Sequence, residues 1–291
     1  MLDIIGKRFW FFLGSGIVIL IGIVSLATFG LNIGIELSSG SMMRVGFKQE
    51  VVQGELKQEL ASLGYANAII QRTGEGDFLL RLPELSGDTR AQLEAGLAAK
   101  FGAFEVKEFA GVSPLVAAET MRNTAIAVAI AAIGILLYVT WAFRKMPNPL
   151  RYGTCAIIAL VHDVLVVVGI FSILGHILGW EINLMFITGI LAVIGYSVND
   201  TVVIFDRIRE NLLKARTFNF EVVVNNSLVE TLGRSLNTSL TTLLTVLALL
   251  LFVGATIQNF AVVLLIGIIA GTYSSICIAA PLLVVWERRS K

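Results

Sequence analysis

The sequence predicts a polytopic α-helical membrane protein with six transmembrane helices and one α+β extracytoplasmic domain. Of its 291 residues, 56% are hydrophobic and only 15% are charged, whereas soluble domains average about 45–50% apolar and about 25% charged residues. The apolar excess lies in long blocks, and a helix crosses the hydrocarbon core in about 20 residues. The blocks are Phe9–Phe29, Ala125–Phe143, Tyr152–Leu174, Ile182–Phe205, Leu240–Val253 with its flanks, and Phe260–Trp286.

The composition and the absence of several motifs exclude other classes of protein. A net charge of +1 argues against a general nucleic-acid binder. Cys155 and Cys277 both lie in apolar blocks and lack the spacing of a disulfide framework or a zinc site. The sequence has no GxxxxGK[ST] phosphate loop, GxSxG elbow or HExxH motif. We therefore expect a protein that is not an enzyme and that needs no cofactor or metal.

The positions of Lys and Arg predict the orientation in the membrane. These residues gather at one set of span ends, as in Lys7-Arg8, Arg144-Lys145 and Arg288-Arg289, whereas the short loops "GHILGWE" and "ATIQN" have none. Cytoplasmic loops carry the excess of basic residues. We therefore expect a protein of the plasma (inner) membrane with both termini in the cytoplasm. The first apolar run is longer than a typical signal-peptide core of about 7–15 residues, which favours an uncleaved helix.

This topology divides the chain into three parts. Residues 1–30 form the first transmembrane helix, residues 31–122 the extracytoplasmic domain, and residues 123–291 a five-helix domain with a cytoplasmic loop at 207–236. In the middle part, alternating and helical patterns succeed one another in the order βαββαβ, which is that of a ferredoxin-like fold. The segments are "SMMRVGF", "EVVQGELKQELASLG", "ANAIIQR", "DFLLRLP", "SGDTRAQLEAGLAAKFG" and "AFEVKEF", and the first helix should bury Val52, Leu56, Leu60 and Leu63.

Two carboxylates interrupt the apolar spans and are the main functional candidates. Asp163 follows His162 near the middle of span three, and Asp200 follows Asn199 in the cytoplasmic half of span four. A charged side chain inside a membrane costs several kcal/mol and is by default a functional-site hypothesis. Burial disfavours the ionised carboxyl and a nearby cation favours it, so such a group can change charge state with its surroundings. We favour Asp163 over Asp200, which lies nearer the inner interface.

Further polar residues accompany these carboxylates and are expected to support them. Helical spacing places most of the span-four residues on one face, and the hydroxyls of span five can hydrogen-bond across helices. We expect the polar residues of spans three and four to face a second subunit, because one six-helix bundle offers few groups to pair them. The supporting residues are His162, Tyr196, Ser197, Asp206, Arg207, Thr241 and Thr242.

At these residues the sequence resembles the SecF members of the SecD/SecF family of protein-export membrane proteins, in the resistance-nodulation-division superfamily. The resemblance rests on "VHDVLVVVGIFSI", "GYSVNDTVVIFDRIREN", "TLGRSLNTSLTTLLTVLALLLFVG" and "FAVVLLIGIIAGTYSSICIAAPLLVVW" and covers nearly the whole chain. One stretch departs from the family pattern. The usual "GIDFTGG"-like segment reads "GIELSSG" here, and Ser39 stands where a glycine would be usual.

The resemblance implies a function in late-stage protein export, driven by the proton-motive force. Its implied partners are a SecD-like subunit, the SecYEG channel, the SecA ATPase indirectly, the translocating preprotein and the lipid bilayer. Asp163, Asn199 and Asp200 would then couple protons to export, and Arg207 would be a partner at the inner end. Two alternatives stay open at this point: half of a proton-driven small-molecule exporter of the same superfamily, and a non-transporting scaffold for membrane-protein assembly.

Overall fold

The computed structural model describes residues 2–73, 76–214, 219–252 and 257–289. The chain forms two compact units. One consists of Met1–Asn32 and Ile126–Lys291, and the other of Ile33–Ala125. Helix α5 (Pro114–Ala142) runs across the boundary between them.

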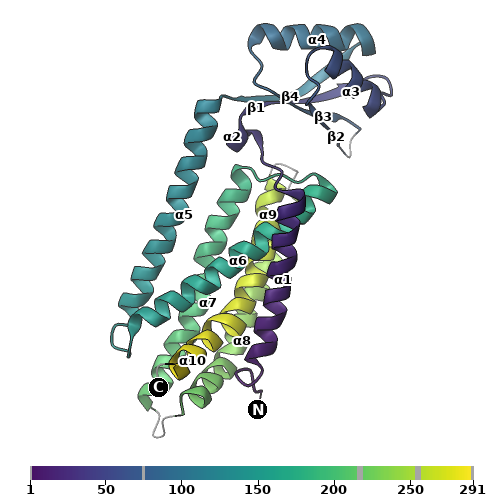
Figure 1. Ribbon diagram of the computed structural model, residues 1–291. Helices are drawn as coiled ribbons and strands as arrows, with labels where there is room; N and C mark the ends of the chain where they lie inside the picture. Colours follow the sequence, from purple (N-terminus) through teal and green to yellow (C-terminus); the bar gives the residue numbers. More distant parts are fainter. Residues whose placement is uncertain (1, 74–75, 215–218, 253–256, 290–291) are drawn as a thin grey trace. The chain divides into compact units, whose positions relative to one another are not determined.

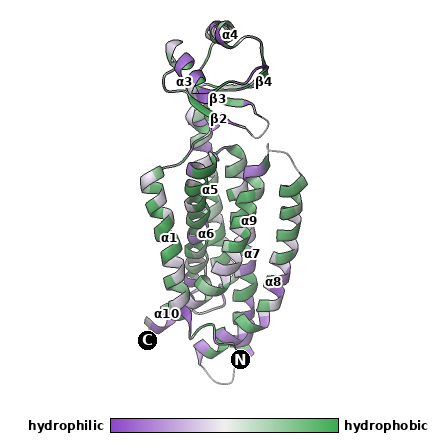
Figure 2. Cartoon of the chain, turned by 90° about the vertical axis from the view of Figure 1, so that its right-hand side faces the viewer, coloured by the Kyte–Doolittle hydropathy of each residue, from purple (hydrophilic) through white to green (hydrophobic). Residues whose placement is uncertain are grey.

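Long apolar helices build the first unit, and Figure 2 shows them coloured largely as hydrophobic. In the described part of the chain, six helices are long and apolar enough to cross a membrane. The prediction of a multi-pass membrane protein is therefore confirmed. The helices are α1 (Arg8–Phe29), α5, α6 (Pro149–Leu178), α7 (Leu184–Lys214), α8 (Phe220–Phe252) and α9 (Gln258–Ser274), which continues through a π-helical turn η2 (Ser275–Ala279) into α10 (Ala280–Arg289).

The predicted cytoplasmic loop at 207–236 is mostly helical in the described residues, because both flanking helices extend into it. Helix α7 runs on to Lys214, and α8 already begins at Phe220. Ion pairs one turn apart, between Arg207 and Glu210 and between Arg209 and Asp206, stabilise the polar end of α7. The sequence prediction ended the helix where the apolar run ended, but a helix continues into water when its side chains are polar. Val253, the predicted end of span five, lies outside the described residues.

Glycines let the helices of this unit approach closely. Helix α9 packs against α6, α7 and α8, and α1 packs against α6 (Figure 1). A Cβ atom added to Gly169 would lie 2.7 Å from the Cα of Gly22, and one added to Gly271 would lie 2.9 Å from the Cβ of Ser197. Real Cβ atoms do not approach other atoms so closely, so these positions need glycine. Small residues have this role in membrane helices generally.

Asn225 of α8 fastens the segment before α1. Its Oδ1 accepts hydrogen bonds from the amides of Ile4 and Ile5, at 2.9 and 3.2 Å, and its Nδ2 donates to the carbonyl of Leu2 at 2.9 Å. Glu221, one helical turn earlier, forms ion pairs with the buried Arg8 and with Arg288 of α10. The start of the chain, the start of α8 and the end of α10 are thereby linked.

The second unit contains an antiparallel four-stranded sheet with the strand order β2-β3-β1-β4. This order and the βαββαβ succession are those of the predicted α+β fold, which is confirmed. Strand β1 is central and pairs Met43 with Leu80 of β3 and with Phe109 of β4. The strands are β1 (Gly40–Phe47), β2 (Ile69–Arg72), β3 (Phe78–Leu82) and β4 (Phe104–Val112), and the helices are α2 (Ile35–Ser38), α3 (Gln53–Ser62) and α4 (Gly87–Phe101).

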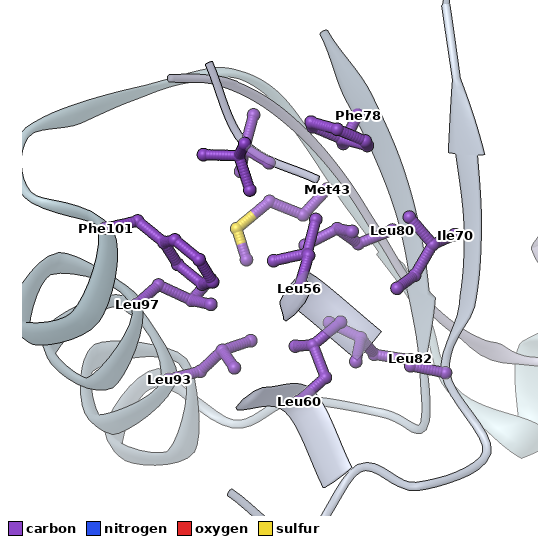
Figure 3. Close-up of a cluster of buried hydrophobic side chains, with 13 residues drawn as sticks. Met43, Leu56, Leu60, Ile70, Phe78, Leu80, Leu82, Leu93, Leu97 and Phe101 are labelled. Carbon is purple, nitrogen blue, oxygen red and sulfur yellow. The ribbon is translucent and has the colours of Figure 1, made fainter. Parts of the chain in front are cut away.

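The core of this unit lies between the sheet and the helices α3 and α4 (Figure 3). Leu93, Leu97 and Phe101 come from α4, and Leu56 and Leu60 come from α3. The prediction that Val52 joins this stripe is wrong, because its side chain is 61% exposed. Val52 is the residue before the first turn of α3 and has an extended backbone, so the helical spacing does not apply to it. Val51 is buried instead.

A tight turn joins α2 to β1 at the departure from the family pattern. Ser39 has φ +67° and ψ +166°, a backbone region that is almost restricted to glycine. Gly40 follows with φ +121°, and a Cβ atom there would lie 2.6 Å from the carbonyl oxygen of Leu82. Ser39 therefore carries backbone strain in this structure.

Candidate functional site

Asp163 lies in α6 and is fully buried. Three side chains contact its carboxylate: one from α7, one from α9, and that of the preceding residue, His162. Its Oδ2 accepts hydrogen bonds from the hydroxyls of Ser197 in α7, at 2.6 Å, and Ser274 in α9, at 2.8 Å. Its Oδ1 lies 3.0 Å from Nδ1 of His162. Bonds of this kind satisfy a buried carboxylate without a full cationic partner. The arrangement fixes the Asp163 side chain between the helices.

His162 extends this network to α1. Its Nε2 lies within hydrogen-bond distance of the hydroxyl of Ser15, and its ring stacks near Tyr273 with 6.1 Å between the centroids. The Tyr273 hydroxyl donates in turn to the carbonyl of Phe11, at 2.8 Å. If Ser15 donates to Nε2, then Nδ1 carries the proton and donates to Asp163. One chain of polar contacts thus runs from α1 through His162 to Asp163.

The approach of α9 to α7 brings the hydroxyls to Asp163. Gly271 allows the contact, and Ser274 lies one turn further along the same helix. The π-helical turn that begins at Ser275 then directs this neighbouring hydroxyl to Thr201, at 2.8 Å. Single π-helical turns occur often at functional sites. Here the turn allows two consecutive serines both to reach polar partners in the core.

Asp200 belongs to a second and sparser polar cluster. The hydroxyl of Ser239 in α8 donates to its Oδ2 at 3.3 Å, and Ser239 also lies 2.6 Å from the hydroxyl of Thr272 in α9. Tyr196 approaches the same Ser239 hydroxyl at 3.5 Å. Asp200 is only 3% exposed. Among the described residues, this buried carboxyl accepts a single, long side-chain hydrogen bond.

A cavity of about 710 Å³ lies beside this second cluster. Its lining is mostly apolar and comes from the segment before α1, from α1, α8, α9 and η2, and it includes Ser239, Thr272 and Tyr273. Asp200 is therefore one hydroxyl away from open space, whereas Asp163 is enclosed by its hydrogen-bond donors. The two carboxyls differ in both pairing and access.

The chain itself supplies the partners of most predicted polar residues, which corrects the expectation that they face a second subunit. His162, Asp163, Ser197 and Asp200 are all buried among the helices of this chain. The expectation did not take into account the hydroxyls of spans one and six as partners for these residues. Ser15, Ser239, Thr272, Ser274 and Ser275 were missed as site residues. The dense hydroxyls of "GTYSS" beside Gly271 were the available signal.

Three predicted residues lie away from both clusters. Asn199 is exposed on α7, one step around the helix from Asp200. Thr241 is exposed and Thr242 half-buried on α8, and their hydroxyls donate to backbone carbonyls of their own helix, such as that of Thr238. The structure therefore leaves these polar groups on the surface of α7 and α8.

Asp206 and Arg207 likewise pair outside the clusters, at the polar end of α7. Arg207 binds Glu210 at 2.7 Å and Glu230 at 2.6 Å, and Asp206 binds Arg209 at 2.6 Å. Asn211 also donates to Glu230, at 2.8 Å. These contacts join the end of α7 to the start of α8, and they do not include Asp163 or Asp200.

Comparison with known proteins identifies the family. The model for "Protein export membrane protein SecD/SecF, C-terminal" matches residues 92–289. The chain belongs to the SecD/SecF family. The "SecD/SecF GG Motif" model matches residues 24–51, which include the turn at Ser39 and Gly40.

Individual members of the SecD/SecF family match over almost the whole chain. Protein translocase subunit SecF of Thermobaculum terrenum is 45% identical over 99% of this chain and 95% of its own length. Protein translocase subunit SecF of Anaerolinea thermophila is 43% identical over 99% of this chain and 94% of its own length. Protein translocase subunit SecDF of Bacillus subtilis is 35% identical over 99% of this chain but 38% of its own length.

The fold also matches that of a solved family member. The crystal structure of SecDF, a translocon-associated membrane protein from Thermus thermophilus, superposes with a TM-score of 0.86 and 33% sequence identity. The match covers 99% of this chain and 39% of that chain. This chain therefore spans about two fifths of the SecDF proteins and nearly all of the separate SecF subunits that it matches.

Proposed function

We propose that this chain is the SecF-like half of a proton-driven unit that assists late-stage protein export. Its relatives are Sec translocase subunits, and the Bacillus subtilis SecDF joins a SecF-like part to further sequence in one chain. By analogy, this chain pairs with a separate SecD-like subunit and works with the SecYEG channel after SecA has moved the preprotein. Both termini lie in the cytoplasm and the α+β unit lies outside.

The observation that carries this proposal is the burial of two carboxyls, Asp163 and Asp200, in transmembrane helices. Neither is paired with Lys or Arg of the described residues. A buried carboxyl without a cation is costly when ionised and is relieved by a proton. A proton moving through such a group gains about 2.3 kcal/mol per 100 mV of membrane potential. That gain is of the size needed to bias a shift of packed helices.

The geometry favours Asp200 over Asp163 as the carboxyl that exchanges the proton. Asp163 has two hydroxyl donors and a neighbouring histidine, which hold its side chain in place. Asp200 has one long hydrogen bond and lies next to the hydroxyls that line the cavity. We therefore assign proton exchange to Asp200 and the positioning of α6, α7 and α9 to Asp163. This reverses the preference drawn from the sequence.

The exposed polar residues on α7 and α8 support a partner subunit. Asn199 and Thr241 are exposed in the described part of the chain, and an exposed amide such as that of Asn199 is unfavourable against lipid. We infer that this surface faces the SecD-like subunit. Cysteines at Asn199 or Thr241 should cross-link to a second chain in native membranes, while a cysteine at Ser197, which is buried, should not. Intrachain products alone at all three positions would contradict the pairing.

Translocation in vesicles tests the coupling. Preprotein completion is measured with and without a proton gradient for Asp200→Asn, Asp163→Asn and, as a control, Asp206→Asn at the exposed end of the same helix. Asp200→Asn should lose the gain from the gradient, and Asp206→Asn should keep it. If both buried variants gain as much as the wild type, the chain is not the proton-coupled component. If Asp163→Asn alone loses the gain, proton exchange belongs to Asp163.

Reporter fusions test the orientation. A reporter after Lys291 should be cytoplasmic, and one inserted near Gly87, at the start of α4, should be external. Reporters found on the same side would rule out this topology, because α1 and α5 flank the α+β unit.

A further inference from the structure

A second cavity lies at the end of the membrane unit where the connection of α5 to α6 meets the ends of α7 and α10. It measures about 250 Å³ and is separate from both carboxyl clusters. Figure 1 shows that the start of α1 and the end of α10 lie at the same end of this unit. The lining residues are Lys145, Met146, Pro147, Arg151, Tyr152, Leu212, Leu213, Phe220, Leu283 and Glu287.

The polar part of this cavity has an excess of positive charge. Lys145 and Arg151 line it together with one carboxylate, Glu287. Arg151 binds Glu287 at 2.9 Å, which also joins α6 to α10. Lys145 is exposed and forms no ion pair with any residue in the described ranges. The cavity therefore keeps a cation at its mouth whose charge this part of the chain does not neutralise.

Tyr152 adds a hydroxyl that lacks a partner. The residue is 3% exposed, and its ring is fixed by stacking on Phe143 at 5.2 Å and by an edge contact with Phe205 at 5.4 Å. Its hydroxyl forms no hydrogen bond with residues 2–73, 76–214, 219–252 and 257–289, and it is not one of their fully buried unpartnered atoms, so it is open to the cavity. A ligand in the cavity would supply that partner.

The remaining lining is apolar and opens to the outside of the unit. Leu213 is 77% exposed, and Met146, Leu212 and Leu283 also belong to the apolar part of the lining. The volume is below the roughly 300–1,000 Å³ of typical small-molecule sites, so it suits a compact group. A ligand that fits must combine a small anionic head with an apolar tail.

We propose that this cavity binds the phosphate head of an anionic glycerophospholipid. Lys145 and the Tyr152 hydroxyl bind the phosphate, Arg151 adds positive charge, and the first acyl carbons lie along Leu212 and Leu213. Basic pockets between transmembrane helices at a membrane surface are known to bind anionic lipid heads. The cavity lies at the ends of the spans, where lipid heads are found. This site is independent of the proton coupling proposed for Asp200.

Lipid titration by native mass spectrometry tests the site. The full chain, purified and delipidated in mild detergent, is titrated with phosphatidylglycerol and, separately, with zwitterionic phosphatidylcholine. One molecule of phosphatidylglycerol should bind about tenfold more tightly than phosphatidylcholine. Lys145→Gln should weaken phosphatidylglycerol about fivefold, as expected for one cation near a membrane surface. Tyr152→Phe, which keeps the ring stacking, should weaken it about threefold.

The neighbouring Arg144 provides a matched control. Its guanidinium lies 4.5 Å from the ring centre of Trp141, and it does not line the cavity. Arg144→Gln removes the same charge as Lys145→Gln and should leave the affinity unchanged. Equal losses in the two variants, or equal binding of the two lipids, would overturn the proposal. Displacement of the lipid by an excess of inorganic phosphate that itself binds would show a free-phosphate site, which also overturns it.

Discussion

Gly271 of α9 lies so close to Ser197 of α7 that an added Cβ atom would be 2.9 Å from the Cβ of Ser197. Ser197 donates the 2.6 Å hydrogen bond to Asp163, so the helix contact and the carboxyl pairing depend on each other. Gly271→Ala should push α9 away from α7 and destabilise the unit by about 1–3 kcal/mol. Thermal unfolding in detergent measures the effect. Gly195→Ala, where an added Cβ atom meets nothing within 4 Å, should not destabilise.

The two serines on Asp163 should be energetically coupled. Ser197→Ala or Ser274→Ala alone leaves one hydroxyl on the same Oδ2 and should cost about 0.5–1.5 kcal/mol, as for a typical hydrogen bond. The double variant leaves that oxygen without either donor, so its loss should exceed the sum by about 0.5 kcal/mol or more. Equilibrium unfolding of the wild type, the two single variants and the double variant gives the double-mutant cycle. Pairing Ser197→Ala with Ser172→Ala, whose hydroxyl binds the carbonyl of Gly30, should instead be additive.

Replacing Ser39 by glycine should stabilise the α+β unit. At φ +67° and ψ +166° a side chain is strained, and such residues cost about 1–3 kcal/mol. Glycine relieves this strain, but its greater conformational freedom in the unfolded chain offsets part of the stabilisation. We therefore expect the free energy of unfolding to rise by about 1 kcal/mol. Hydrogen exchange of the β1 amides would report it as slower opening. Gly40→Ala should act in the opposite sense, and faster exchange in Ser39→Gly would contradict the strain.

Asn225→Ala should release the segment before α1. The change removes the acceptor for the amides of Ile4 and Ile5 and the donor to the Leu2 carbonyl. Hydrogen exchange at Ile4 and Ile5 should rise by about tenfold or more, consistent with about 1.4 kcal/mol of lost protection. Asn225→Asp keeps the acceptor, so these two amides should stay protected. Equal exchange in the two variants would show that the side chain does not hold this segment.

Arg81 should make the free energy of unfolding depend on pH only at high pH. It is buried in β3, and this burial lowers its pKa to about 10, against the opposing effect of the nearby Glu36. Above about pH 10 the folded chain loses this proton before the unfolded chain does, so stability rises with pH. Below about pH 9 both forms are protonated and the effect is constant. The difference in urea stability between wild type and Arg81→Met should be flat from about pH 7 to 9 and then move in favour of the wild type. A flat difference up to about pH 11 would contradict the lowered pKa.

The sequence predicted those features that depend on local pattern or on the cost of a charge in hydrocarbon. The six helices, the βαββαβ succession and the burial of Leu56 and Leu60 follow from apolar length and periodicity. The burial of Asp163 and Asp200 follows from their place in apolar runs. Patterns of this kind depend on residues that are close together in the sequence, and so they can be recognised without a structure.

The partners of each carboxyl could not be predicted in the same way. Ser274 is 111 residues from Asp163, and Ser239 is 39 residues from Asp200. Which hydroxyl meets which carboxyl depends on helix rotation and on the close contacts at glycines, neither of which a hydropathy pattern contains. Asn199 shows the same limit. It is only one residue from Asp200 in the sequence, but the rotation of the helix places its side chain on the outer surface.

The contact between Gly22 and Gly169 limits how this protein can vary. Each residue already has the smallest side chain available, and added Cβ atoms would come within 3.1 and 2.7 Å of the opposite Cα. In most packed interfaces a larger residue on one side is offset by a smaller one on the other. Here neither side has anything left to remove, so no second-site substitution on the facing helix can restore the fit. A screen for suppressors of Gly169→Ala should therefore recover changes that move the whole of α1, or true revertants, but none at Gly22.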